Sequence, residues 1–276
     1  MGTDDPRLNT AGIIDFRLGR MIAAWKKADP PPMRVKPVPI QVLRRLAYLA
    51  QHSPPSSLLR ATVDMIIIAF FFLLRPGEYT DSPSDTKPFT LGDVQLFLGD
   101  RRLDLRTSSA DELRCARFGS LTFTEQKNGV RGEVIGLGCS GDSYLCPVKA
   151  LVRRVLCLRA AGASSPTPLA RLINQPTSVT PSQITSLLRQ AVCELGTDLG
   201  FLPSDVSARC LRAAGATALL VGKVDTDVIR LIGRWRSDEM LRYLHVQAAP
   251  LMSDFARRML HAGDYSLIPN QHVPQR

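Results

Sequence analysis

The sequence predicts a mainly α-helical protein with a small antiparallel β-sheet, on the basis of three observations. Apolar residues recur at helical spacing over several long segments. Proline stands where the first turn of several of these segments would lie, a position that it favours. In the middle of the chain, two strand-like runs flank an Asn-Gly dipeptide, which favours a tight hairpin because both residues accept positive φ.

The helical segments are spread along the whole chain. Residues 57–74 are apolar nearly all round from Met65 on, which predicts a buried helix. We expect this helix to end at Arg75, because Pro76 disfavours helical geometry in the residue before it. The other expected helices cover residues 8–28, the segment from Pro39 through Leu49, Pro147 to about Ala160, and Pro181 to about Leu195.

The expected strands lie between residues 91 and 137. Residues 91–107 alternate unevenly between apolar and polar, which indicates one or two strands. Residues 120–127 and 130–137 flank Asn128 and Gly129 and form the predicted hairpin, with Lys127 at its tip.

Composition limits the classes of function. The 276 residues carry 35 Lys+Arg against 25 Asp+Glu, a net charge of +10. Such an excess favours a polyanionic partner, because each neutralised phosphate releases counterions, although a basic surface without such a partner is the alternative. The apolar run from Met65 to Leu74, about ten residues, is too short to cross a bilayer, so no membrane partner is expected. Six scattered cysteines suggest free thiols in a reducing compartment, and the four histidines form no metal-binding pattern.

The stretch from Val206 to His245 carries the most specific pattern. Arg209 and Arg212, three residues apart, open a helical segment whose positive end suits a phosphate, although solvated arginines on an amphipathic helix are the common meaning of this spacing. A Gly-Arg-Trp-Arg-Ser turn follows, and Tyr243 stands nine residues after Arg234. This order resembles the C-terminal signature of the tyrosine recombinase (phage integrase) family, which reads His-x-Leu-Arg, Leu-Gly-His and then Tyr. The Gly-Arg-Trp-x-Ser motif is most similar to that of the retrotransposon-type branch found in eukaryotic mobile elements.

Two upstream residues extend the resemblance. Arg75 follows a buried helix and precedes Glu78 by three residues, as in the first arginine box of the family. Lys127 occupies the hairpin on which the family places its catalytic lysine. Each of these residues also has an ordinary explanation, a surface turn for Arg75 and a turn-flanking lysine for Lys127. Their order with the C-terminal residues favours the functional interpretation.

The resemblance implies a fold and a reaction. The fold would be the helical catalytic domain of the family, with a three-stranded sheet. Tyr243 would attack a DNA phosphate and form a 3′-phosphotyrosyl bond, which a 5′-hydroxyl later reverses. Arg75, Arg212 and Arg234 would hold the phosphate and Lys127 would protonate the leaving oxygen, with no cofactor and no metal. A tyrosine at its usual pKa of about 10 is a weak nucleophile, and neighbouring cations would activate it.

The chain departs from the family pattern at two positions. Arg209 stands where the family usually has His, and arginine cannot give up a proton, so only a phosphate-binding role would survive there. Arg234 stands at the position of the second His, while Trp235 is one residue out of that register, and which of the two enters the site stays open. Arg209, Trp235 and Arg236 are predicted DNA contacts.

Domain organisation and partners follow from the same resemblance. We expect N-terminal helices and a Pro-rich linker over residues 1–56, a remnant of the DNA-clamping arm, then a catalytic domain over 57–262 and a tail over 263–276. The expected partner is double-stranded DNA, with self-association on it, in the nucleus. Two alternatives are a catalytically impaired DNA-binding remnant of a mobile element and an unrelated basic helical protein, such as an RNA-binding or scaffold module.

Overall fold

The structure is a computed structural model that divides the chain into two compact units, residues 1–34 and 35–276. It describes residues 14–28, 36–82, 87–125, 129, 131–173, 175–195 and 200–235. The first unit contains helix α1 (Phe16–Ala28), which lies within the helix predicted over residues 8–28. All the other elements belong to the second unit.

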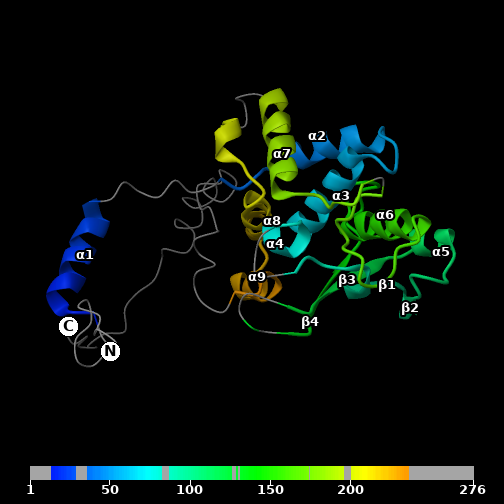
Figure 1. Cartoon of the computed structure of the whole chain (residues 1–276), viewed down its shortest axis with the longest axis horizontal. Coiled ribbons are helices and arrows are strands. Elements are labelled where there is room, and N and C mark those ends of the chain that lie inside the picture. Colours follow the sequence, from blue (N-terminus) through cyan, green and yellow to red (C-terminus); the bar gives the residue numbers. More distant parts are fainter. Residues whose placement is uncertain are drawn as a thin grey trace, which may run out of the picture. The chain divides into compact units, whose positions relative to one another are not determined.

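The second unit is mainly helical with one small sheet, which confirms the predicted class (Figure 1). No described helix is both long and apolar enough to cross a membrane. In chain order its elements are α2 (Ile40–Gln51), α3 (Leu58–Phe71), α4 (Pro76–Tyr79), the 3₁₀ turn η1 (Leu91–Asp93), β1 (Val94–Leu98), β2 (Arg101–Leu103), α5 (Ala110–Arg114), β3 (Phe118–Phe123), β4 (Glu133–Gly138), α6 (Pro147–Ala160), α7 (Pro181–Leu195), the 3₁₀ turn η3 (Pro203–Asp205), α8 (Cys210–Val221) and α9 (Thr226–Gly233).

The sheet has four antiparallel strands in the order β2-β1-β3-β4, so the expectation of a three-stranded sheet is wrong. The extra strand is β2, which pairs with β1 through a two-residue loop, with Leu98 opposite Arg101. Gly99 in that loop has φ 58, a positive value that glycine adopts without strain in tight hairpins. The predicted hairpin is present as β3 and β4, and residues 126–128 at its tip lie outside the described part of the chain.

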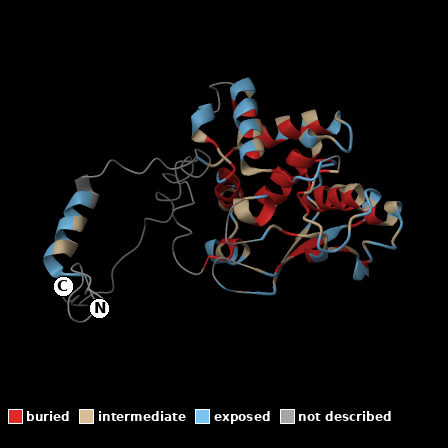
Figure 2. Cartoon of the chain, viewed as in Figure 1, coloured by how far each residue is buried: buried red, intermediate tan, exposed pale blue. Residues whose placement is uncertain are grey.

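Helix α3 is at the centre of the core and contacts α2, α6, α7 and α8 (Figures 1 and 2). Its residues from Ala61 to Phe70 are all buried, as the run of apolar residues predicts. Helix α6 packs between α3 and the sheet and contacts β1, β3 and β4. Helix α2 packs against α3 and α7 in the same core. The domain boundaries at residues 56 and 262 stay predictions.

The end of α3 differs from its prediction and has its own cause. The helix stops at Phe71, and Leu73 then takes φ 52 in the left-handed region, which ends helical geometry before proline is reached. Pro76 instead begins α4 as its first helical residue. The four residues between the helices, Phe72 to Arg75, therefore form a turn, and the candidate site is built on this turn.

Candidate functional site

Two arginines from distant parts of the chain bind the backbone carbonyls that end α3. Carbonyls in the last turn of a helix lack partners within the helix, and cationic side chains are favourable there. Arg212 Nη1 donates to the Leu73 carbonyl at 2.9 Å. Arg234 Nη1 donates to the Phe72 carbonyl at 3.2 Å, and its Nη2 to the Leu73 carbonyl, also at 3.2 Å. These bonds fix α8 and the end of α9 to the turn after α3.

A buried carboxylate joins the third arginine to this turn. Arg75 is the N-cap of α4, and its backbone N–H donates to Glu78 Oε2 at 2.8 Å. The Arg75 guanidinium lies 3.0 Å from Glu78 Oε1, and Arg234 Nη2 lies 3.0 Å from Glu78 Oε2. Glu78 is 1% exposed. One carboxylate therefore bridges two arginines, and with Arg212 the cluster keeps a net positive charge.

Arg212 is placed by the close approach of α8 to α3. A Cβ added to Gly215 would lie 2.2 Å from the Phe70 carbonyl oxygen, so only glycine allows this approach. Arg212 itself is 4% exposed and also donates through Nη2 to the Gly233 carbonyl. Its guanidinium stacks on the ring of Trp235, 4.3 Å from the ring centroid, a cation–π arrangement.

Arg234 is held in a strained backbone position. It is the C-cap of α9, with φ 57 and ψ 40 in the left-handed region that residues other than glycine rarely adopt. A Cβ on Gly233 would meet the Trp235 ring at 1.6 Å, which explains glycine there. The Arg234 guanidinium lies over the Phe123 ring at 3.8 Å, so the end of β3 also contributes to the cluster.

Electrostatics at Arg234 reflect its burial. The side chain is out of contact with solvent, and its Nε has no hydrogen-bond partner among the described residues. Burial lowers the pKa of Arg234 to about 10, against the opposing effect of Glu78 and together with the charge of Arg75. The guanidinium therefore stays protonated at neutral pH.

Four of the predicted site residues meet in this cluster: Arg75, Arg212, Arg234 and Trp235. Arg209, a predicted DNA contact, differs from these four residues. It is the exposed N-cap of α8. Arg209 and Arg212, which were expected to open one helical segment together, differ in burial, because Arg209 is exposed and Arg212 is buried. Lys127, Arg236 and Tyr243 lie outside the described residues, and their roles stay predictions.

Sequence reasoning noted Glu78 only as an acidic neighbour of Arg75 and missed Phe123. The sequence does contain a signal for the position of Glu78. It is the third residue of a turn that begins with proline, and a glutamate there bonds back to the N-cap. Phe123 carries no such signal, because its contact with Arg234 depends on how the sheet packs against α9.

Among the described residues of the cluster, Arg75 is the cation that an incoming anion can reach. The Arg75 side chain is 27% exposed, whereas Arg212 and Arg234 donate hydrogen bonds to backbone carbonyls inside the protein. To bind a phosphate directly, either buried arginine would have to exchange a carbonyl for a phosphate oxygen. Within the described ranges, no group of three or more His, Cys, Asp or Glu side chains could hold a metal ion.

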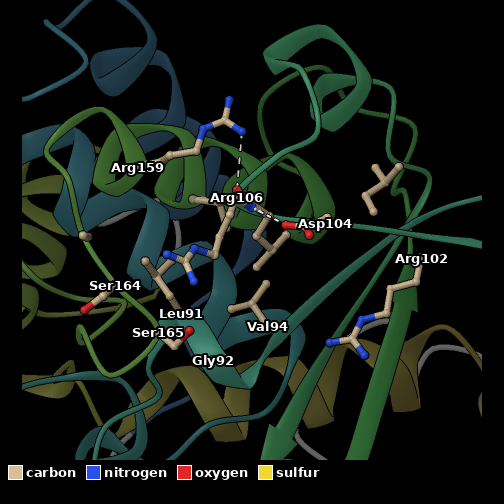
Figure 3. Close-up of a pocket in the computed structure, with 13 residues that line it drawn as sticks. Leu91, Gly92, Val94, Arg102, Asp104, Arg106, Arg159, Ser164 and Ser165 are labelled. Atoms are coloured by element: carbon tan, nitrogen blue, oxygen red, sulfur yellow. Dashed lines mark hydrogen bonds between the residues drawn. The ribbon is translucent and has the colours of Figure 1, made fainter.

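A separate cavity of about 410 Å³ lies between η1, the turn after β2 and the end of α6 (Figure 3). Arg159 lines it and donates through Nη1 to the Ser108 carbonyl at 2.6 Å. Asp104 holds the turn by accepting from the Arg106 and Thr107 backbone N–H groups, which also lower the pKa of Asp104. None of the predicted site residues that the structure describes lines this cavity.

Comparison with known proteins gives only remote similarities. No family model matches the chain, and no curated protein matches its sequence. The integrase of transposon Tn1549 in complex with transposon right-end DNA has a TM-score of 0.47 and 14% identity, covering 84% of this chain and 68% of that one. The XerA recombinase has a TM-score of 0.48 and 19% identity, covering 87% of this chain and 67% of that one. Similarities at this level are too remote to transfer a function.

Proposed function

We propose that the protein binds double-stranded DNA and cuts and rejoins it through a 3′-phosphotyrosyl intermediate at Tyr243. The observation that carries the proposal is the meeting of Arg75, Arg212 and Arg234 at one turn, with Glu78 between two of them. These arginines are far apart in the sequence, yet they are the ones whose order resembles the tyrosine recombinase signature. Clustered guanidiniums are suited to the charge that develops on a phosphate during transesterification.

The proposed reaction exchanges one phosphate ester for another. The Tyr243 hydroxyl gives its proton to solvent as its oxygen bonds to phosphorus, the bond from phosphorus to the 5′-oxygen breaks, and Lys127 gives that oxygen a proton, which Lys127 regains from solvent. A 5′-hydroxyl of the partner strand then reverses the step, so bond energy is kept and no cofactor or metal is required. Arg75 is the arginine that meets the phosphate first, since its side chain is the accessible one. Arg209, Trp235 and Arg236 would contact the DNA around the site.

The wider setting belongs to the same proposal. The Gly-Arg-Trp-Arg-Ser motif supports an origin in a eukaryotic mobile element. With such an origin the protein would act in the nucleus. Strand exchange requires a second active site, so the protein would assemble with further copies on DNA. The basic balance of the chain, +10, supports the polyanionic partner.

A second function, DNA binding without cutting, is favoured by a specific observation. Arg212 and Arg234 are both 4% exposed and donate to carbonyls, an arrangement that stabilises the fold. Arg209 also replaces the histidine that could transfer a proton. In this alternative the cluster is a structural remnant of a catalytic site, and only exposed cations bind DNA.

A nicked suicide substrate separates the two functions. If the protein cuts DNA, incubation should yield a covalent protein–DNA adduct that maps to Tyr243. Tyr243→Phe should abolish the adduct while leaving affinity for DNA unchanged, because only the attacking oxygen is removed. Arg75→Ala should slow adduct formation by about a hundred- to a thousandfold, the usual cost of one preorganised donor.

The matched control is Arg102→Ala, which removes an exposed arginine that lines the other cavity and should leave the adduct rate unchanged. Wild-type protein that binds DNA normally and gives no adduct would overturn the cutting function and leave the second one. Absence of DNA binding at low ionic strength would contradict both.

A further inference from the structure

Two cysteines separated by six residues are brought together where β4 leads into α6. Cys139 follows the last residue of β4, and Cys146 is the N-cap of α6. Their spacing suggests no common site in the sequence. In the structure the backbone N–H next to Cys139 donates to Cys146 Sγ, and all six cysteines of the chain are free thiols.

The intervening loop is closed by its own hydrogen bonds. Ser140 Oγ donates to the Leu145 carbonyl at 2.8 Å, and Asp142 Oδ1 accepts from the Leu145 backbone N–H at 2.7 Å. The Ser140 backbone N–H donates to Cys146 Sγ at 3.5 Å. Because that nitrogen is two bonds from Cys139 Cα, Cys146 Sγ lies within about 6 Å of Cys139 Cα. This proximity places Cys146 Sγ beside the residue to which a disulfide would join it, and the two sulfur atoms would have to close to about 2 Å to form the bond.

The two thiols differ in access and in acidity. Cys139 is partly exposed, whereas Cys146 is 0% exposed. Burial alone would raise the pKa of Cys146, but the backbone N–H groups of Lys149, Ser140 and Val148 outweigh it and lower that pKa. Burial raises the pKa of Cys139, and the neighbouring Cys146 raises it further. Cys139 is therefore the thiol that solvent reaches, and the buried Cys146 is the thiol that loses its proton more readily.

We propose that Cys139 and Cys146 form a reversible dithiol–disulfide site that is oxidised by small disulfides such as oxidised glutathione. The Cys139 thiolate attacks the reagent, forms a mixed disulfide and releases one glutathione thiolate. The Cys146 thiolate then attacks Cys139 Sγ and releases the second. The two protein protons end on two glutathione thiols, so the protein loses two electrons and the reagent gains them.

The test is oxidation of the native full-length chain with oxidised glutathione, followed by acid quench, denaturation, alkylation and peptide mapping. In wild-type protein the peptides that contain Cys139 and Cys146 should be cross-linked, with a loss of the mass of two hydrogen atoms across the pair, and neither cysteine should be open to alkylation. Dithiothreitol should reverse the change.

The single variants should behave differently from each other. Cys146→Ser should accumulate a stable mixed disulfide at Cys139, because the resolving thiol is gone. Cys139→Ser should stay unmodified at Cys146, which solvent does not reach. Cys193→Ser, at an exposed position on α7, is the control and should cross-link like wild type.

Two results would overturn the proposal. One is a wild-type mixed disulfide at Cys139 that never converts to the internal cross-link. The other is full alkylation of both cysteines after oxidation while exposed Cys115 and Cys193 react with the reagent. If Cys146→Ser fails to fold, the wild-type cross-link and the Cys139→Ser result decide the matter on their own.

Discussion

At the scale of single residues, Glu78 organises the arginine cluster. It accepts from the Arg75 backbone and pairs with the guanidiniums of Arg75 and Arg234. A buried carboxylate is costly to desolvate, and its charged partners compensate for that cost only while all of them are present. Removing the negative charge would leave Arg234 buried with its backbone partners alone.

We therefore expect Glu78→Gln to lower the free energy of unfolding by about 3–5 kcal/mol, the usual cost of breaking a buried pair from one side. The measurement is denaturation in urea, followed by circular dichroism.

Glu112→Gln is the matched control for that substitution. Glu112 is also the third residue of a helix, bonds back to the N-cap Ser109 and pairs with Arg101 at 2.9 Å, but its side chain is 41% exposed. Its replacement should move the unfolding midpoint far less. Equal losses from the two variants would show that burial of Glu78 contributes nothing.

At the scale of elements, the sequence predicted those segments whose signals are local. Proline at the first turn located α6 and α7, and Asn128 with Gly129 located the β3–β4 hairpin. The end of α3 was missed because Leu73 takes the left-handed conformation that glycine or asparagine usually marks at a helix end, and neither residue stands there. The Leu73 carbonyl accepts from Arg212 and Arg234, which follow it by 139 and 161 residues.

The same distinction applies to the candidate site. Arg75, Arg212 and Arg234 follow one another in the order of the family signature. That order was enough to group them into one site. The burial of Arg212 and Arg234 was not predictable, since arginine is rarely buried without partners, and here most of the partners are backbone carbonyls that no sequence pattern marks.

The packing of α8 on α3 gives a prediction at this scale. Gly215→Ala should lower the free energy of unfolding by about 1–3 kcal/mol, because the added methyl group meets the Phe70 carbonyl and must push the helices apart. The loss should occur although alanine is the better helix former. Thermal unfolding of the purified protein measures it.

The same substitution in α1 is the control, because a Cβ on Gly19 would meet nothing within 4 Å. Gly19→Ala should leave the unfolding temperature unchanged or raise it slightly. A Gly215→Ala protein as stable as wild type would mean that α8 sits farther from α3 than the structure places it.

At the scale of the whole molecule, net charge and available charge differ. Of the 35 Lys+Arg, Arg154, Arg212 and Arg234 are buried and bond to carbonyls, so they add little to the field that a polyanion meets. The proposed affinity for DNA would therefore depend on exposed cations such as Arg209.

DNA binding should weaken steeply with salt, with a logarithmic slope of about −0.9 for each phosphate neutralised. Arg209→Ala should make that slope shallower by about one unit, because one phosphate contact is lost. Tyr243→Phe should leave it unchanged. Fluorescence anisotropy of a labelled duplex over a series of salt concentrations measures all three, and affinity that is flat in salt would contradict any role of phosphate contacts.

The turn after α3 has a consequence for how this chain can diverge. Arg212 and Arg234 are anchored there by the main-chain oxygens of Phe72 and Leu73, atoms that every amino acid supplies. Replacement of those two side chains can disturb packing but cannot delete the anchor. The amino acids at positions 72 and 73 therefore give almost no indication of the anchoring role. Two proteins with the same anchor need not share a residue at those positions.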